Sequence, residues 1–215
     1  MSWNCTTNSA AFHNTTVNIS IPAKLVKPWG AVYLFLCFKG AVGNLLIVCL
    51  TLANRKLRTG CGLLIAHCLL TYTILCGFSF PIVGTSVYRK LVYDWQMDPK
   101  HCKLFQWIQM GARFASHWFD LYIAINRIVA LIFPHHYRRF SRKTVQGFVV
   151  AFIWIGAFGT SLLGWFDWAL TFVMIPLGTC ACIPKGHFGM ILYTIVFYLP
   201  SVITAGLYIS IYLKI

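Results

Sequence analysis

Three ionisable side chains stand inside one long apolar stretch of the sequence, at Arg113, His117 and Asp120. Their spacing of i, i+4 and i+7 places them on one face of a helix. A charge in the middle of a membrane costs about 2.5–3.5 kcal/mol on insertion scales, so such residues face the interior of a helix bundle and have partners there. One interpretation is a mutual polar ladder that runs from Arg113 through His117 to Asp120. Asn44 and Tyr72 would pack against this ladder.

The stretches that position these side chains have the length of membrane spans. Hydrophobic residues make up 59% of the 215 residues and charged residues only 10%, against about 25% charged in an ordinary soluble domain. Five apolar runs, at about 29–53, 62–86, 104–133, 146–170 and 188–213, are long enough to cross a hydrocarbon core about 30 Å thick. We therefore expect an all-α, multi-pass transmembrane helix bundle at 29–215, preceded by an extracellular tail at 1–28.

Basic residues and glycosylation sequons indicate the orientation of this bundle. The basic residues behind the net charge of +14 lie mostly between the apolar runs, in short gaps that the positive-inside rule assigns to the cytoplasm, so we expect no nucleic-acid partner. Three Asn-X-Ser/Thr sequons precede the first run, at Asn4, Asn14 and Asn18. Such acceptors belong on a lumenal or extracellular segment. The N-terminus is therefore predicted to lie outside, with the first helix serving as an uncleaved signal-anchor.

Nine cysteines divide by their position along the chain. Four fall within apolar runs as small buried hydrophobes, and Cys61 lies at a cytoplasmic helix boundary, where it stays reduced. The oxidising outer side, where a disulfide can persist, holds Cys5, Cys102, Cys180 and Cys182. The Cys-X-Cys pair formed by the last two could instead bind a metal with His101 or His187. The outer location favours disulfide chemistry, and we expect no metal and no cofactor.

A series of motifs extends over nearly the whole chain. Gly43-Asn44 in the first run is followed by a basic turn at 54–58, and Cys102 precedes Arg127 by 25 residues, which is about 37 Å of helix. The other motif residues, in chain order, are Trp95, Asn126, Ile128, Pro134, Tyr137, Trp154, Pro200 and Tyr208. Together these residues resemble the rhodopsin-like (class A) family of G-protein-coupled receptors. The segments 125–127 and 135–137 also resemble those of invertebrate receptors near the melatonin and medium-chain fatty-acid receptor groups.

The resemblance implies the first five helices of a seven-helix receptor in the cell membrane, which passes a signal from an extracellular ligand to a heterotrimeric G protein. It also implies a disulfide from Cys102 to the loop between the fourth and fifth helices, where Cys180 and Cys182 are both candidates. Membrane lipids and receptor oligomers are further expected partners. The residues expected to serve G-protein coupling are Asn126, Arg127, Pro134, Tyr137 and Tyr208.

Two residues depart from the family pattern at positions that the family uses to restrain its arginine and to bind sodium. Asn126 stands where the family has an acidic residue that pairs with the following arginine, so we expect a weaker resting restraint on Arg127. Tyr72 stands where the family has an aspartate in the second helix. This replacement puts the family's sodium site in doubt, although Ser116 matches one of its polar partners.

The resemblance also suggests a second interpretation of Arg113. This arginine lies one turn below Gln109, in the region where family members bind ligand. Its guanidinium could pair with an anionic group. The expected ligand is then acidic, such as a fatty acid, rather than a biogenic amine, whose usual aspartate is replaced here by Gln109.

The sequence ends at Ile215, soon after Tyr208, with no sixth or seventh helix. We expect a fragment, a shortened gene model or a truncated splice product, and a truly truncated chain could be retained in the endoplasmic reticulum. One alternative is a truncated receptor that associates with full-length receptors and modulates them. Another is a transporter or channel subunit, because ionisable residues in a membrane often mark ion paths, although the sequence has no inverted repeat. The aspartates are scattered rather than paired, so we expect no enzyme.

Overall fold

The computed structural model describes residues 23–55, 57 and 61–214. Its elements are the helices α1 (Ala23–Ala53), α2 (Gly62–Ile74), α3 (Phe80–Tyr93), α4 (Pro99–Ile132), α5 (Pro134–Phe140), α6 (Lys143–Trp165), α7 (Gly186–Tyr193) and α8 (Leu199–Lys214), with the strands β1 (Leu170–Met174) and β2 (Cys180–Pro184). The predicted glycosylation sites Asn4, Asn14 and Asn18 lie outside the described residues.

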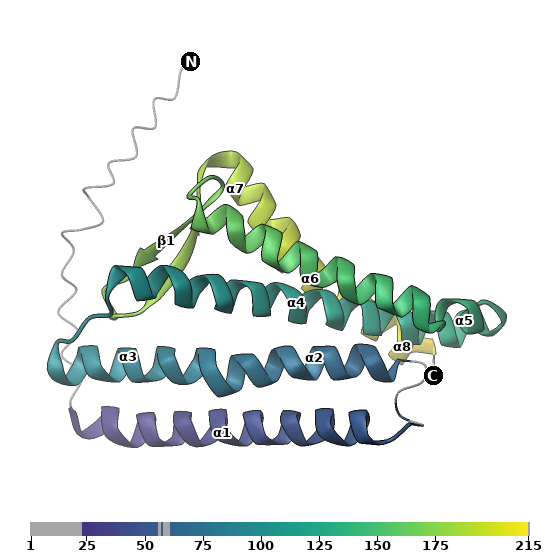
Figure 1. The fold of residues 1–215 in the computed structure, drawn as a ribbon, viewed down its shortest axis with the longest axis horizontal. Coiled ribbons are helices and arrows are strands. Elements are labelled where there is room, and N and C mark those ends of the chain that lie inside the picture. The colour runs from purple at the N-terminus through teal and green to yellow at the C-terminus, as the bar shows by residue number, and fades with distance from the viewer. Residues whose placement is uncertain (1–22, 56, 58–60, 215) are drawn as a thin grey trace, which may run out of the picture.

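Two pairs of helices each form one continuous rod. A π-helical turn at Leu75–Ser79 joins α2 to α3, and a second at Thr194–Tyr198 joins α7 to α8. The described residues therefore build five long helical units, and successive units run in opposite directions along the bundle (Figure 1). This arrangement is the partial seven-helix bundle that the sequence predicts.

The helices extend past the apolar runs that predict them. α1 begins at Ala23 rather than near 29, and α3 continues to Tyr93 rather than ending near 86. The 31 residues of α1 span about 46 Å at 1.5 Å per residue, whereas hydrocarbon occupies only about 30 Å. A helix can therefore continue into the polar headgroup region, where its sequence no longer needs to be apolar.

The predicted helix over 146–170 is too long, and the all-helical expectation omits a hairpin. α6 ends at Trp165, because Asp167 adopts a left-handed backbone conformation with φ of 56° that reverses the chain. The alternating residues of 170–174 then pair antiparallel with β2, with Leu170 opposite Pro184 and Met174 opposite Cys180. Gly178, with φ of 73°, forms the turn between the strands. The backbone groups of this outer loop thus pair with one another.

α4 is the central helix of the bundle. It contacts α2, α6 and α8, and it lies between the α2–α3 rod and α6 in Figure 1. By length and hydropathy, the other four rods are candidate membrane spans: Val26–Ala53, Gly62–Tyr93, Lys143–Trp165 and Gly186–Leu213. α4 carries too many charged and polar side chains to qualify by composition. The central position of α4 explains how it can still cross a membrane, because ionisable residues are tolerated there where neighbouring helices cover them.

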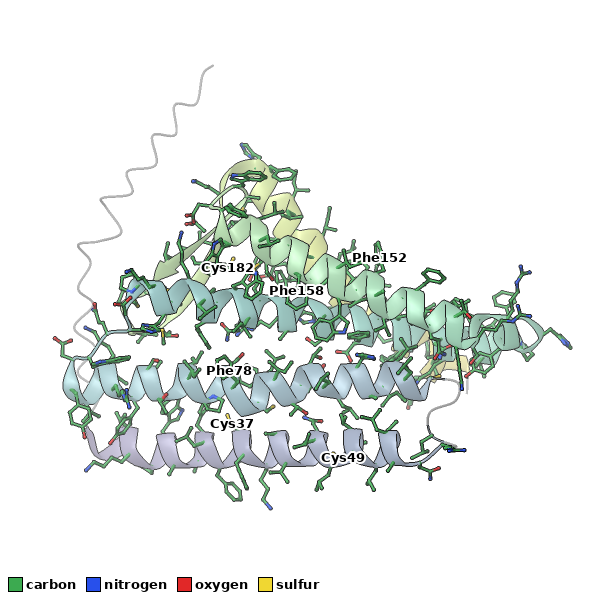
Figure 2. The ribbon with its side chains drawn as sticks, viewed as in Figure 1. Cys37, Cys49, Phe78, Phe152, Phe158 and Cys182 are labelled. Atoms are coloured by element: carbon green, nitrogen blue, oxygen red, sulfur yellow. A yellow bond between two sulfur atoms is a disulfide. The ribbon has the colours of Figure 1, made fainter. Side chains whose placement is uncertain are left out.

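A cluster of buried side chains joins α2, α4 and α6. Leu64, Phe119 and Ala157 are fully buried there, and the indole of Trp154 donates a hydrogen bond to His67 Nδ1 at 3.3 Å. Close packing and interhelical hydrogen bonds hold helices together in lipid, where hydrophobic burial supplies little. The opposite face of α6 is apolar and exposed, and Figure 2 shows Phe152 pointing away from the bundle, as expected of a lipid contact.

Candidate functional site

A disulfide ties the hairpin to the outer end of α4. It joins Cys102 to Cys180, whose Cα atoms are 5.7 Å apart. Cys182 stays a free thiol, and its Sγ lies 3.7 Å from Met110 Sδ on α4 (Figure 2). The structure thus selects Cys180 of the two candidates, and the bond removes the second thiol that the metal alternative requires. Because disulfides persist in oxidising compartments, this end of the bundle is the outer one.

An ion pair reinforces the same junction. Lys103 Nζ on α4 lies 2.8 Å from the carboxylate of Asp167, which also accepts a hydrogen bond from Thr171 at 2.9 Å. The hydrogen bond from Lys103 is the main reason that the pKa of Asp167 lies below its usual value. The side chains of both charged residues are more than one third exposed, so the pair adds little stability. Its effect is to position the start of β1 over α4.

A cavity of about 420 Å³ lies beneath the hairpin. Such a volume falls within the usual range of small-molecule sites, about 300–1,000 Å³. α4 supplies Arg113, the middle of β2 supplies Cys182, and the π-helical turn of the fifth rod supplies Phe197. The other lining residues are Val83, Gln106, Gln109, Met110, His117, Thr179, Cys180, Ala181, Tyr193, Tyr198 and Ser201. The predicted ligand residues Gln109 and Arg113 thus meet in one cavity.

The polar lining of this cavity is largely unpaired. The Arg113 guanidinium forms no ion pair and no hydrogen bond within the described part of the chain. Gln106, Gln109 and Thr179 are 5%, 2% and 6% exposed, and each has an enclosed polar atom without a hydrogen-bond partner among the described residues. The cavity is thus bordered by one cation and by three buried polar residues that each keep an atom without a partner in the described ranges.

The predicted ladder from Arg113 to Asp120 is wrong, because each member has a different partner. Asp120 accepts hydrogen bonds from Tyr72 at 2.5 Å and from Cys68 at 3.3 Å, both on α2. His117 Nδ1 lies 3.2 Å from Ser201 Oγ on α8. Seven residues of helix separate Arg113 from Asp120 by about 10 Å. Neighbouring helices therefore offer closer partners than the same helix does.

The two remaining members of the expected polar network also have other environments. Ser116 is buried and donates to the backbone oxygen of Arg113 at 2.8 Å, so it does not reach Asp120. Asn44 is partly exposed on α1 and forms no hydrogen bond within the described ranges. Of the predicted network, the structure brings together Tyr72 and Asp120.

The residues expected to serve G-protein coupling gather at the opposite, inner end of α4. Arg127 is exposed and has no ion-pair partner among the residues that the structure describes, and its guanidinium lies 5.7 Å from the Tyr208 ring on α8. Pro134 is exposed and opens α5. Tyr137 follows on the same short helix. Arg127, Pro134 and Tyr208 thus present exposed groups at one end of the bundle.

A thiol holds the residue before Arg127. Asn126 is 1% exposed, and its amide donates to Cys61 Sγ at the start of α2. The Tyr137 hydroxyl lies 3.5 Å from the same sulfur, and this hydrogen bond is the main cause that raises the pKa of Tyr137. Cys61 therefore joins the inner ends of α2 and α4 to α5, in a position where sequence reasoning treated it only as a reduced cysteine.

Three further cavity residues, Gln106, Thr179 and Ser201, were not predicted from the sequence. Gln106 precedes Gln109 by one helical turn, so helical spacing could have added it to the candidate ligand residues. Thr179 and Ser201 come from segments distant in the sequence, and only the folded hairpin and the packing of α8 on α4 bring them to the cavity. No local pattern marks such residues.

Comparison with known proteins agrees with this geometry. The family model for the 7 transmembrane receptor (rhodopsin family) matches residues 43–215, which is most of the chain. The chain belongs to the rhodopsin family of seven-transmembrane receptors. Among its relatives, the Substance-P receptor of Cavia porcellus is 24% identical over 154 residues, which are 69% of this chain and 37% of that receptor.

Two further relatives of this rhodopsin-family chain are receptors with other names. The Neuropeptides B/W receptor type 2 of Bos taurus is 29% identical over 147 residues, covering 67% of this chain and 42% of that receptor. The Melatonin receptor type 1B of Homo sapiens is 28% identical over 116 residues, covering 53% of this chain and 31% of that receptor. The chain thus spans well under two thirds of the length of these relatives. It is a membrane protein of a family that is not an enzyme class.

Proposed function

We propose that these residues form the ligand-binding and transducer-facing part of a receptor, which passes a signal from an extracellular ligand to a heterotrimeric G protein at the cell membrane. One observation carries the proposal: α4 lines the outer cavity through Arg113 and presents Arg127 at the inner face. The two arginines are 14 residues apart, or about 21 Å along one rigid helix. A ligand that shifts α4 from outside therefore acts on the surface inside.

The cavity supports an acidic ligand. Arg113 is its unpaired cation, and a guanidinium binds carboxylate or phosphate groups with paired hydrogen bonds. Gln109 lies one turn away and adds neutral hydrogen-bonding capacity. A biogenic amine would meet repulsion from Arg113 and no carboxylate in the cavity lining, because the nearest aspartate of α4, Asp120, is engaged by Tyr72 and Cys68.

The inner surface supports coupling to a G protein. Arg127 is exposed, and its guanidinium lies 5.7 Å from the centre of the Tyr208 ring. Asn126 is held by Cys61 and carries no charge, so it does not neutralise Arg127. The arginine is thus available to a partner protein, and the contact with Tyr208 connects it to the fifth rod.

Nucleotide exchange on G proteins tests the proposal. The uninterrupted reading frame that contains residues 1–215 is expressed in membranes with heterotrimeric G proteins, and binding of a non-hydrolysable GTP analogue is followed without added ligand. Exchange should exceed that of membranes lacking the protein, and Arg127→Ala should abolish the excess. Arg139→Ala is the matched control, because it removes an exposed inner arginine from α5 and leaves α4 intact.

Two outcomes would contradict the proposal. In one, Arg127→Ala and Arg139→Ala both leave exchange equal to that of the unmodified protein at equal surface expression. In the other, the reading frame gives no exchange of its own but lowers the surface amount of a co-expressed rhodopsin-family receptor. The latter result would identify the chain as a modulator of other receptors.

A further inference from the structure

Lys39 stands in the middle of an apolar membrane span. It lies 13 residues after Val26 and 14 before Ala53, the two ends of the span, which is about 20 Å along the helix from either one. Its side chain is exposed, and an extended lysine reaches only about 6 Å from its Cα. Because the hydrocarbon core is about 30 Å thick, an ammonium group at this depth stays within hydrocarbon.

No carboxylate of the described residues neutralises Lys39. Its ammonium lies 5.5 Å from the centre of the Phe35 ring, one turn away on the same helix, and no ion pair within the described ranges includes it. A ring face attracts a cation but leaves its charge in place. Charged residues inside a membrane normally have a partner of opposite charge or a polar one. The described part of the chain does not supply this partner.

A second copy of these residues cannot supply it either. The whole sequence contains four acidic residues. Three of them lie at or just beyond the outer ends of helices: Asp94, Asp98 and Asp167. The fourth, Asp120, accepts two hydrogen bonds from α2. Two copies that packed through the exposed side of α1 would therefore bring two lysines together in hydrocarbon.

The exposed side of α1 around Lys39 has the spacing of a helix-packing seam. The residues of this Lys39 seam follow one another at alternating steps of four and three: Val32, Leu36, Lys39, Gly43, Leu46 and Leu50. All of them are exposed. Such a seven-residue repeat is typical of helices that pack along each other with a slight left-handed twist. From Val32 to Leu50 the seam is about 27 Å long, which is nearly the thickness of the hydrocarbon core.

The Lys39 seam differs from the face that α1 uses inside the bundle. α1 lies at the edge of the bundle and contacts α2 and α3 (Figure 1). On that face, a Cβ added to Gly40 would lie 2.9 Å from Cys76 Sγ, whereas a Cβ added to Gly43 would meet no atom within 4 Å. Small residues let the backbones of two membrane helices approach closely. Gly43 therefore leaves room for another helix one turn from Lys39.

We infer that the Lys39 seam binds a transmembrane helix of a second membrane protein, which carries an aspartate or glutamate at mid-membrane depth. The carboxylate pairs with the Lys39 ammonium, and the apolar residues of the seam pack along the partner helix. The pair is favoured because each charge alone is costly in hydrocarbon. Binding here involves neither the cavity beneath the hairpin nor Arg127, so it is independent of the proposed function.

Single-span probe helices test the charge requirement. The uninterrupted reading frame that contains residues 1–215 is co-expressed with a tagged helix of about 20 leucine and alanine residues that has aspartate at its centre. The matched probe has leucine there. The photo-crosslinking residue p-benzoylphenylalanine replaces Leu46 of the seam. In the control it replaces Leu45, which is exposed at nearly the same depth but lies about 100° around the helix.

The aspartate probe should be crosslinked from position 46 about tenfold more than the leucine probe, as expected of a polar pair between membrane helices. Position 45 should capture both probes equally. Lys39→Leu should lower capture of the aspartate probe to that of the leucine probe, and Lys39→Asp should favour a probe with a central lysine instead. Lys27→Leu removes an exposed lysine near the outer end of the same helix and should change nothing.

Gly43→Leu separates close packing from charge. The new side chain starts in open space, so the bundle and Lys39 should be unaffected. Capture of the aspartate probe from position 46 should nevertheless fall about fivefold, because the leucine holds the probe backbone away from the seam.

Three results would overturn the proposed partner. The first is equal capture of the aspartate and leucine probes from position 46. The second is undiminished capture of the aspartate probe by Lys39→Leu. The third is crosslinks from position 46 that join the protein only to itself, within one copy or between two, because a segment of the same reading frame would then cover the Lys39 seam.

Discussion

Substitution of Tyr72 by phenylalanine is expected to destabilise the bundle without changing its shape. The Tyr72 hydroxyl donates to Asp120 Oδ2 at 2.5 Å, and Cys68 supplies the only other hydrogen bond to this carboxyl group within the described residues. A hydrogen bond to a charged group contributes about 1.5–3 kcal/mol in proteins generally, whereas interhelical hydrogen bonds in membranes average about 0.6 and reach about 1.7 kcal/mol. The short distance argues for the upper part of the membrane range, about 1.5 kcal/mol.

A double-mutant cycle measures this contribution. Thermal unfolding of the detergent-solubilised chain is followed by tryptophan fluorescence for Tyr72→Phe, Asp120→Ala and the double variant. At about 2–4 °C per kcal/mol for a chain of this length, Tyr72→Phe should lower the Tm by about 3–6 °C. The coupling free energy between the two sites should be about 1.5 kcal/mol.

Tyr88→Phe is the matched control for this experiment. Tyr88 lies on the same rod, and its hydroxyl forms no hydrogen bond within the described part of the chain. Its loss should change the Tm by less than about 1 °C. If Tyr72→Phe unfolds at the same temperature as Tyr88→Phe, or if the cycle gives zero coupling, Asp120 is not held by α2 and the account of the central helix fails.

Three further perturbations test the outer junction. Gly164→Ala should cost about 1–3 kcal/mol in thermal unfolding, because its Cβ would collide with the Phe172 ring, while Gly159→Ala, which meets open space, should be neutral. The pKa of Asp167 is lowered in the fold, so its carboxylate adds a small amount to the free energy of unfolding. This contribution should be complete above the ordinary pKa of 3.8 and should be lost as the pH of a denaturation series falls below that value. Burial raises the pKa of Cys182 to about 11, so maleimide labelling there should rise about tenfold per pH unit between 7 and 9, and a flat profile would contradict this burial.

The membrane spans were predictable because lipid leaves few alternatives. A segment that crosses hydrocarbon must satisfy its backbone internally, so long apolar runs such as 29–53 imply helices regardless of detail. α4 is an exception. Its polar face makes it the weakest membrane span by composition, although it is the central helix of the bundle. Resemblance to the receptor family, rather than hydropathy, identified its two ends through Cys102 and Arg127.

The hairpin and the pairing of polar groups were not predictable from local pattern. β1 and β2 are short and lie outside the hydrocarbon, where the left-handed residue Asp167 and the bond from Cys102 to Cys180 determine the path of the chain. Asp120 shares a helix face with Arg113, yet it pairs with Tyr72 because α2 is closer than the next two turns of its own helix. The hydrogen-bond partner of such a residue depends on helix packing, which cannot be read from a single sequence.

The central claim is that Arg113 makes the outer cavity a site for anions, and the charge of a thiol reagent tests it most directly. Sulfonatoethyl and trimethylammonioethyl methanethiosulfonates have similar sizes and opposite charges, and both can modify Cys182 in the cavity. At about 1 kcal/mol per unit of reagent charge, Arg113→Gln should reduce the ratio of anionic to cationic labelling rates by about thirtyfold. An unchanged ratio in Arg113→Gln would show that the guanidinium does not act on the cavity, and the anionic-ligand account would be wrong.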